Sequence, residues 1–222
     1  MTRLKIAIQK SGRLTQESQA LLKECSIDVQ DGKRTLLAPA NNFPIDILYL
    51  RDDDIPQYLE DGIVDIGILG ENVLLESQKK VSIVKRLGFA KCRLSLAIPK
   101  GETYTGLSYF QGKRIATTYS NIVKGFLAEK NIDVEIHEIS GSVEIAPNIG
   151  LAEGICDIVS TGSTLMSNGL KEVETILRSE AIIAAASNLS AEKDEILQKL
   201  IFRIDAVSAA KKNKYILLNV PN

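Results

Sequence analysis

Residues 155–165 place small hydroxyl residues around a glycine, directly after an apolar run that carries one acid. The apolar run predicts a strand, and the residues after the glycine predict the start of a helix. A strand–turn–helix of this kind presents backbone N–H groups and hydroxyls that suit a phosphate group. Asp157, just before the turn, adds a carboxylate suited to the hydroxyls of a sugar. The candidate phosphate-binding residues are Ser160, Thr161, Gly162, Ser163 and Thr164.

The same segment also fits a plainer interpretation. Ser and Thr are common N-cap residues, so spacing alone slightly favours an ordinary capped helix start. Two nucleotide-binding motifs are absent from the sequence. There is no Gly-Lys-Ser/Thr, which excludes a nucleoside-triphosphate P-loop, and no G-x-G-x-x-G dinucleotide fingerprint.

Two pairs of basic residues are candidates for binding an anion. Lys10 and Arg13 flank a glycine turn after the predicted strand 4–9, and Lys33 and Arg34 precede another short strand. Cations at the carboxyl end of a strand suit an anionic ligand, and Arg can bind phosphate oxygens through two parallel hydrogen bonds. Taken alone, either pair is also typical of surface charge.

Other residues that could do chemistry have structural interpretations beside the chemical ones. The three acids at 52–54 could bind a metal ion, but acids followed by Pro56 are more typical of the start of a helix. Glu144 is either a second acid for a sugar or metal, or simply a first-turn glutamate. His137 is the only histidine, and we interpret it as structural. That interpretation excludes a mechanism that needs a histidine-activated nucleophile.

Composition narrows the class of protein. The chain has 222 residues, 45% of them apolar, and a formal net charge of −1, which argues against nucleic-acid binding. No apolar run approaches the roughly 20 residues that span a bilayer. The N-terminus lacks a signal peptide's apolar segment, and the three cysteines have no disulfide or zinc spacing. We therefore expect a cytoplasmic protein with reduced thiols and no membrane partner.

The segment around Gly162 is similar in sequence to a segment earlier in the chain. Residues 61–70 align with 153–162 at an offset of 92 positions. Two weaker matches, at offsets of 105 and 109, join 22–29 to 127–134 and 5–11 to 114–120. Buried strands resemble one another, so convergence of two β-α-β units is the alternative. Three matches in the same order favour an internal duplication.

The repeat predicts an α/β protein of two lobes, each an open, mostly parallel sheet flanked by helices. We expect a first lobe of residues 1–93 plus 182–222, a second lobe of residues 94–181 with the phosphate-binding loop, and a cleft between them. Residues 93–98 and 181–186 are the expected crossing strands. The expected strands are 4–9, 45–50, 63–69, 114–118, 133–138, 155–160 and 215–218, and the expected helices are 15–25, 55–61, 120–130, 142–153 and 190–212.

Taken together, these motifs resemble the ATP phosphoribosyltransferase family across essentially the whole chain. The matching segments are 9–13, 51–56, 65–72, 92–96, 141–147 and 157–165, in family order. The resemblance implies a two-lobed core like that of type II periplasmic binding proteins. It also implies the first step of histidine biosynthesis, in which the phosphoribosyl group of phosphoribosyl pyrophosphate passes to N1 of the adenine of ATP. Mg²⁺ is expected to be bound mainly through the substrate pyrophosphate.

The resemblance also assigns roles to residues. Ser160 to Thr164 are expected to hold the 5′-phosphate, and Asp157 and Glu144 to face the ribose. Arg13 and Arg34 are expected to stabilise the departing pyrophosphate, Lys10 to assist with the phosphates, and Tyr119 to stack on adenine. Thr118-Tyr119-Ser120 stands where Ser-Tyr-Pro is expected, and Asn148 where the family often has Arg, so the details of the nucleotide pocket stay open.

The resemblance is to the long subtype of the family, in which a regulatory domain that binds histidine follows the core. The chain stops about where that domain would begin, which favours a truncated core over a short form with a separate regulatory subunit. A homo-oligomer, at least a dimer, is expected. Two other classes stay open from the sequence: a non-catalytic binding module of the same architecture, and a different sugar-phosphate transferase.

Overall fold

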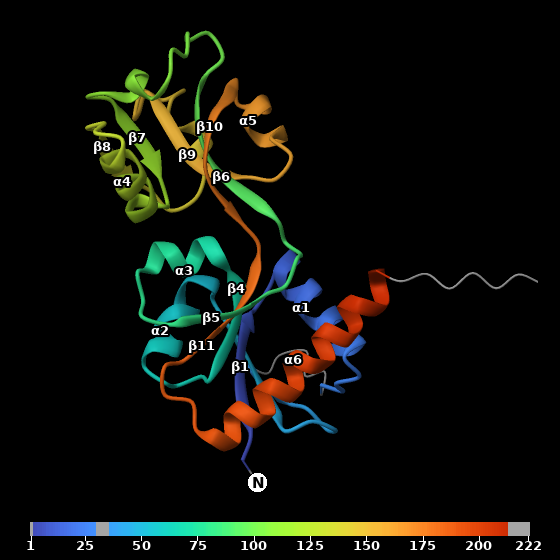
Figure 1. Ribbon diagram of the computed structural model, residues 1–222. Helices are drawn as coiled ribbons and strands as arrows, with labels where there is room; N and C mark the ends of the chain where they lie inside the picture. Colours follow the sequence, from blue (N-terminus) through green and yellow to red (C-terminus); the bar gives the residue numbers. More distant parts are fainter. Residues whose placement is uncertain (1, 30–35, 213–222) are drawn as a thin grey trace, which may run out of the picture. The chain divides into compact units, whose positions relative to one another are not determined.

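The computed structural model describes residues 2–29 and 36–212 (Figure 1). The chain forms two compact units. Unit 1 comprises Met1–Leu69, Lys80–Lys85 and Ile182–Asn222, and unit 2 comprises Gly70–Lys79 and Arg86–Ala181. Residues 70–79 and 86–93, which the sequence division assigned to the first lobe, belong to unit 2. As a functional division into lobes, the proposed boundaries stay a prediction.

The sheet of unit 1 has six strands in the order β2-β3-β1-β4-β11-β5. Its centre is parallel, because β1 pairs in parallel with both β3 and β4, whereas β2 is antiparallel to β3. The elements are β1 (Leu4–Gln9), α1 (Arg13–Glu24), β2 (Leu37–Pro39), β3 (Ile45–Leu50), a 3-10 turn (Asp52–Asp54), α2 (Ile55–Glu60), β4 (Ile66–Gly70), β5 (Ser82–Arg86), β11 (Ala181–Ala185) and α6 (Ala191–Lys212).

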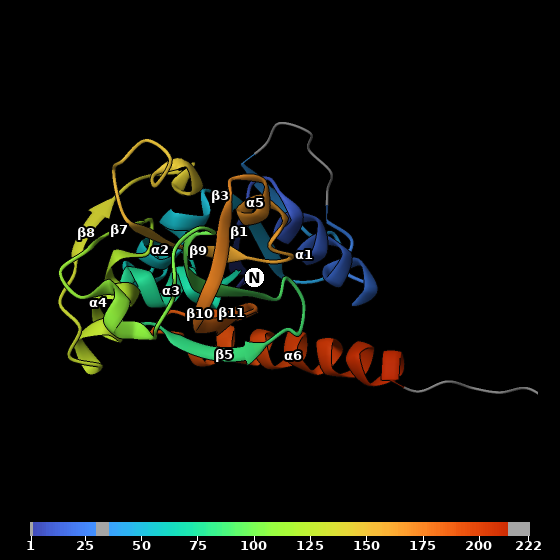
Figure 2. The ribbon, with the colours of Figure 1, turned by 90° about the horizontal axis from the view of Figure 1, so that it is seen from above.

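The central strands of this sheet are buried because most of their residues are apolar, whereas β2 and β5 at the two edges are largely exposed. Leu4, Ile6 and Ile8 of β1 are fully inaccessible to solvent, and all of β11 is buried. The long helix α6 lies beside β5 (Figure 2), where Lys85 and Asp205 form an ion pair. Continuous apolar strands covered by helices are what a parallel α/β sheet requires.

The sheet of unit 2 has five strands in the order β10-β6-β9-β7-β8. β7 pairs in parallel with β8 and β9, and β6 pairs antiparallel with β9 and β10. The elements are α3 (Glu71–Ser77), β6 (Cys92–Pro99), a 3-10 turn (Leu107–Phe110), β7 (Arg114–Thr117), α4 (Ser120–Glu129), β8 (Glu135–Glu138), a 3-10 turn (Val143–Ile145), β9 (Gly154–Val159), α5 (Ser163–Ser167) and β10 (Leu170–Ser179).

The repeat predicted from the sequence is visible in the strand order. The parallel trio β3-β1-β4 of the first copy corresponds to β8-β7-β9 of the second copy. In each trio the first strand of the copy lies at the centre, between its two successors. The expected α/β class and its mostly parallel sheets are therefore confirmed.

Several predicted elements need correction. The expected helix 142–153 is only a 3-10 turn, Val143–Ile145, followed by turns, because Pro147 lacks an N–H and Gly150 has a φ of +72°. The elements α3, β5 and β10 were not predicted from the sequence. The register of β10 against β6 shifts between Glu172 and Glu174 and again between Thr175 and Leu177, which hides the two-residue period of a strand. The expected strand 215–218 lies outside the described residues.

Within the described part of the chain, no helix combines the length and the apolar character that crossing a membrane requires. Cys25, Cys92 and Cys156 form no disulfide. Burial raises the pKa of Cys156 well above its ordinary value, and the nearby charges of Asp157 and Glu76 add to the shift. Cys156 therefore behaves as a small apolar core residue rather than as a thiolate nucleophile.

Candidate phosphate and sugar site

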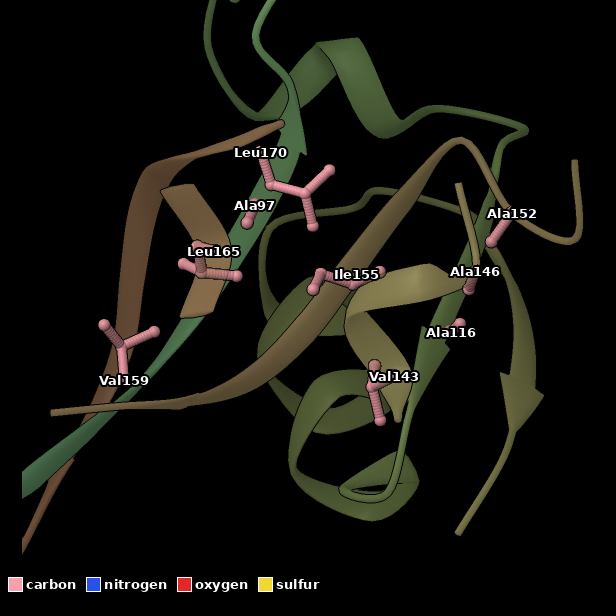
Figure 3. Close-up of a cluster of buried hydrophobic side chains, with 9 residues drawn as sticks. All are labelled: Ala97, Ala116, Val143, Ala146, Ala152, Ile155, Val159, Leu165 and Leu170. Atoms are coloured by element: carbon pink, nitrogen blue, oxygen red, sulfur yellow. The ribbon is translucent and has the colours of Figure 1, made fainter. Parts of the chain in front are cut away.

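The turn between β9 and α5 presents four exposed hydroxyl residues between two buried anchors. Val159 ends the strand, and Leu165 of α5 packs into the same apolar cluster of unit 2 (Figure 3). Between these anchors, all four hydroxyl residues of the predicted loop are exposed: Ser160, Thr161, Ser163 and Thr164. Because both ends are fixed by the core, the loop is held in place while its polar groups stay accessible.

Gly162 permits the tight path of this turn. Its φ is +83°, in the left-handed region that glycine adopts without steric cost. The turn brings Thr161 Oγ1 to 3.0 Å from Ser163 Oγ. Two hydroxyls and the start of α5 thus gather at one point, a set of donors that suits phosphate oxygens.

The turn has a support that sequence reasoning did not include among the site residues. Arg93 of β6 donates a hydrogen bond to the carbonyl oxygen of Ser160 at 3.1 Å. Its guanidinium also binds both carboxylate oxygens of Glu172, at 2.5 and 2.6 Å, and Ser95 donates to the same carboxylate at 2.8 Å. The motif 92–96 contains both Arg93 and Ser95, so the signal that could have identified them was present.

The two predicted ribose-facing acids lie close enough to influence each other. Burial raises the pKa of Asp157, and the negative charge of Glu144 raises it further, while a hydrogen bond from the N–H of Ile158, at 2.7 Å, opposes the shift. Asp157 lies on β9 and Glu144 on the 3-10 turn that packs against β9. Unit 2 therefore holds one carboxyl group on the strand that leads into the hydroxyl turn and a second on the 3-10 turn packed against that strand.

Tyr119 occupies the N-cap position of α4 and is half-buried. Its backbone N–H donates to Thr117 Oγ1 at 2.9 Å, and its phenol oxygen accepts a hydrogen bond from Asn72 Nδ2 at 3.1 Å. Both ends of this residue are thus held by neighbours in unit 2.

In unit 1, Lys10 and Arg13 both lie exposed at the turn from β1 into α1. Gly12 between them has a φ of +112°, and α1 begins without a side-chain cap. The backbone N–H of Lys10 donates to Leu50 O at 2.7 Å, which ties the turn to the end of β3. Open helix N–H groups beside two cations suit an anion. Arg34 lies outside the described residues.

The acidic run forms the 3-10 turn Asp52–Asp54 ahead of α2, with Pro56 in the first turn of that helix. Asp54 is the N-cap by position but makes no side-chain cap hydrogen bond, so the expected capping is positional only. Burial raises the pKa of Asp52 to about 6, with the charge of Asp53 as a second cause. Among the described residues, no three His, Cys, Asp or Glu side chains gather in a way that would hold a metal ion. His137 is partly exposed on the strand β8, where its Nε2 lies 3.0 Å from Glu135 Oε1.

The fold and the exposed turns define a class of protein: two α/β units, each with a parallel trio of strands and one exposed turn that suits an anion. Residues 51–206 match the ATP phosphoribosyltransferase family. The chain belongs to this family, whose reaction is the first step of histidine biosynthesis.

Individual relatives agree with this assignment. The chain is 60% identical over 221 residues to the ATP phosphoribosyltransferase of Cytophaga hutchinsonii, covering 100% of this chain and 77% of that protein. It is 55% identical over 218 residues to the enzyme of Bacteroides fragilis, covering 98% of this chain and 77% of that protein. A solved ATP phosphoribosyl transferase (HisG:HisZ) complex from Thermotoga maritima matches with a TM-score of 0.80 and 30% identity, over 95% of this chain and 100% of that one.

More distant structures share the fold alone. The L-arginine-bound protein Tv2483 matches with a TM-score of 0.65 and 13% identity, over 95% of this chain and 86% of that one. A substrate-binding protein of an amino acid ABC transporter matches with a TM-score of 0.61 and 12% identity, over 94% of each chain. The architecture expected from the family resemblance, that of periplasmic binding proteins, is confirmed.

Proposed function

We propose that this chain transfers the phosphoribosyl group of phosphoribosyl pyrophosphate to N1 of the adenine of ATP. A bond forms between N1 and C1′ of the ribose. The bond between C1′ and the pyrophosphate oxygen breaks, and its electron pair leaves with pyrophosphate. Adenine N1 carries its own lone pair and no proton, so the attack needs no general base. Catalysis then depends on positioning the two substrates and on stabilising the leaving group.

The observation that carries the proposal is the exposed hydroxyl turn Ser160–Thr164, anchored at both ends in the core of unit 2. In the proposed reaction this turn holds the 5′-phosphate of the donor. Asp157 and Glu144 contact the ribose hydroxyls or stabilise the positive charge that develops at C1′. A carboxylate beside a developing cation lowers the barrier because the attraction strengthens in the transition state.

The leaving group and the base are assigned to other residues. Lys10, Arg13 and Arg34 stabilise the negative charge that accumulates on pyrophosphate as the C1′–O bond breaks. The exposed positions of Lys10 and Arg13 at an uncapped helix start support this role. Tyr119 stacks on adenine, and the aromatic ring of a half-buried residue suits that contact.

Mg²⁺ accompanies the reaction through the substrate. The candidate contacts to pyrophosphate are cations rather than carboxylates, a donor set that fits phosphate oxygens and leaves the metal to the pyrophosphate itself. Bound there, Mg²⁺ neutralises charge on the leaving group. Cys25, Cys92 and Cys156 form no disulfide, which suits a reducing compartment, so we place the enzyme in the cytoplasm. A homo-oligomer and a regulatory partner stay predictions.

The direct test incubates the purified protein with ATP, phosphoribosyl pyrophosphate and Mg²⁺. Mass spectrometry should detect the phosphoribosyl-ATP adduct, with one pyrophosphate released per adduct. Omitting Mg²⁺ or either substrate provides the controls. Binding of both substrates without product would instead indicate a binding module, and product with a different acceptor alone would indicate another transferase.

A further inference from the structure

Within unit 2, the short helix α3 holds the N-terminus of α4. The carboxylate of Glu76 accepts hydrogen bonds from the backbone N–H groups of Asn121, at 2.9 Å, and Ile122, at 3.0 Å. In return, Asn121 Nδ2 donates to the carbonyl oxygen of Glu76 at 2.9 Å. A side-chain carboxylate thus occupies the place where the N-terminus of a helix would otherwise bind an external anion. The backbone just after Tyr119 is fixed by these contacts.

A second residue of α3 holds the ring end of Tyr119. Ser179 Oγ accepts the N–H of Asn72 at 3.1 Å and donates its own proton to Asn72 Oδ1 at 2.8 Å. This exchange fixes the orientation of the amide, so that Asn72 Nδ2 faces the phenol oxygen of Tyr119 and donates to it at 3.1 Å. Asn72 and Ser179 are each only 5% exposed, so water competes little for these bonds.

Gly70 leaves room for this amide. A Cβ atom at Gly70 would lie 2.5 Å from Asn72 Oδ1, much closer than side-chain contacts allow. Because Asn72 is bonded to Ser179 and Tyr119, its amide cannot turn away without losing one of them. Glycine is therefore required here by the amide rather than by its own backbone, whose φ of −71° is ordinary.

We propose that Asn72 and Glu76 are positioning residues that hold Tyr119 ready for the nucleotide base and thereby set the affinity for ATP. This inference rests on the proposed function, in which Tyr119 stacks on adenine. Asn72 fixes the phenol end of the ring, and Glu76 fixes the helix start that carries it. An aromatic platform ordered in advance loses less conformational freedom when the base binds.

A double-mutant cycle between Asn72→Ala and Tyr119→Phe tests the coupling. Each single variant should raise KM for ATP about 3- to 10-fold, the size expected for one net hydrogen bond, and leave KM for phosphoribosyl pyrophosphate unchanged. The double variant should be no worse than the worse single variant, because both changes remove the same bond. Additive effects, or equal effects on both substrates, would overturn the inference.

Two further variants separate positioning from general damage to the fold. Gly70→Ala should reproduce the ATP-specific rise in KM, since its methyl group displaces the Asn72 amide, and this variant serves if Asn72→Ala fails to fold. Asn121→Ala is the matched control: it removes an amide at the same α3–α4 junction but leaves the phenol bond intact, so its effects should add to those of Tyr119→Phe. Turnover by the unaltered protein with an additive cycle would overturn the positioning role alone. No adduct from the unaltered protein would overturn the proposed function and, with it, this inference.

Discussion

In each copy of the repeat, one of two strand-to-helix turns is accessible and the other is covered by side chains. The accessible turn follows the first strand of the first copy but the last strand of the second copy. In the first copy the turn after β1 is accessible, with Lys10 and Arg13 exposed, and the turn after β4 leads directly into the buried residues of α3. In the second copy the turn after β7 is filled by Glu76, and the turn after β9 is accessible. Equivalent strand orders therefore do not fix which turn is accessible to a ligand. The side chains that contact each turn decide its accessibility.

Sheet register shows how the second copy gains its hydroxyl turn. In the first copy Ile6 pairs with Ile66. In the second copy Ile115, the counterpart of Ile6, pairs with Gly154, so Ile66 of β4 corresponds to Gly154 of β9, 88 positions later. The helices that follow begin at Glu71 and Ser163, which are 92 positions apart. The second copy thus has four more residues between the paired strand and the helix. Those residues provide the room for the turn.

The register also identifies the true counterpart of Asp65 as Glu153 rather than Asp157. Asp65 accepts the N–H of Lys5 at 2.8 Å and donates its own N–H to Lys5 O at 3.0 Å. Glu153 makes the same two contacts with Arg114, at the same distances. Asp157 has no equivalent acid in the first copy, whereas Asp65 makes structural contacts with Lys5 and Lys193.

The largest effect on activity is expected at the accessible turn of the first copy. Arg13→Ala should keep the fold but lower turnover about 100- to 1,000-fold, because one donor to the leaving group is worth about 2.7–4 kcal/mol. Lys23→Ala, which removes an exposed cation from the other end of α1, is the matched control. Near-normal turnover in a folded Arg13→Ala protein would remove its assigned role. The family resemblance predicts the same loss for Arg34→Ala.

A somewhat smaller effect is expected at the accessible turn of the second copy. Replacing Thr161 by Val and Ser163 by Ala should lower kcat/KM for phosphoribosyl pyrophosphate roughly 10- to 100-fold, since hydrogen bonds to a charged group contribute about 1.5–3 kcal/mol. Ser167→Ala, an exposed hydroxyl at the end of α5, should change nothing. An unchanged kcat/KM in the double variant would mean that the turn is only a helix start.

The structural acids should affect stability instead of chemistry. Asp65→Ala should lower the free energy of unfolding by about 1–3 kcal/mol, because it leaves the N–H of Lys5 and the ammonium group of Lys193, 2.8 Å away, without this partner. Glu153→Ala should cost less, since its ion pair with Arg114 is more exposed. Chemical denaturation measures both. A larger loss for Glu153→Ala would contradict the comparison.

The pH dependence of the Glu153 contribution follows from its pKa. Hydrogen bonds from Arg114 lower that pKa to about 2. A lowered pKa means that the stabilisation is present above the unfolded value, near 4.3, and is lost as the pH falls toward 2. The stability difference between Glu153→Ala and the unaltered protein should therefore shrink over that range. A difference that stays constant from pH 5 to pH 2.5 would refute the ion-pair assignment.

The smallest expected effect concerns Asp157 and Glu144, the two acids predicted to face the ribose. The charge of Glu144 raises the pKa of Asp157, so Glu144→Gln should lower it. If activity needs the ionised form of Asp157, the acidic limb of the kcat/KM profile should move to lower pH. Glu138→Gln, an acid on β8, is the control and should leave that limb in place. An acidic limb that stays in place in Glu144→Gln would contradict the influence of Glu144 on the pKa of Asp157.

Much of the fold could be predicted because local patterns are strong where strands are buried. The strands β1 and β3 match their predicted bounds, and α6 begins within a residue of its predicted start. The hydroxyl turn and the exposed Lys10 and Arg13 were also found from residue types alone. The helix predicted over 142–153 is wrong because the apolar spacing continues past Pro147 and Gly150, whose backbones do not continue a helix. The strand β10 was missed because its bulges break the alternation.

The sequence by itself determined the family, the repeat and the hydroxyl turn, since these depend on residue types in chain order. Only the tertiary structure showed that Asp65 and Glu153 occupy equivalent positions in the two copies. This equivalence follows from register, which depends on which residues meet across strands and not on local similarity. The tertiary structure also decided that Glu76 accepts N–H groups at the start of α4 and that Asn72 donates a hydrogen bond to Tyr119. Those contacts join residues more than forty positions apart, and no local pattern encodes them.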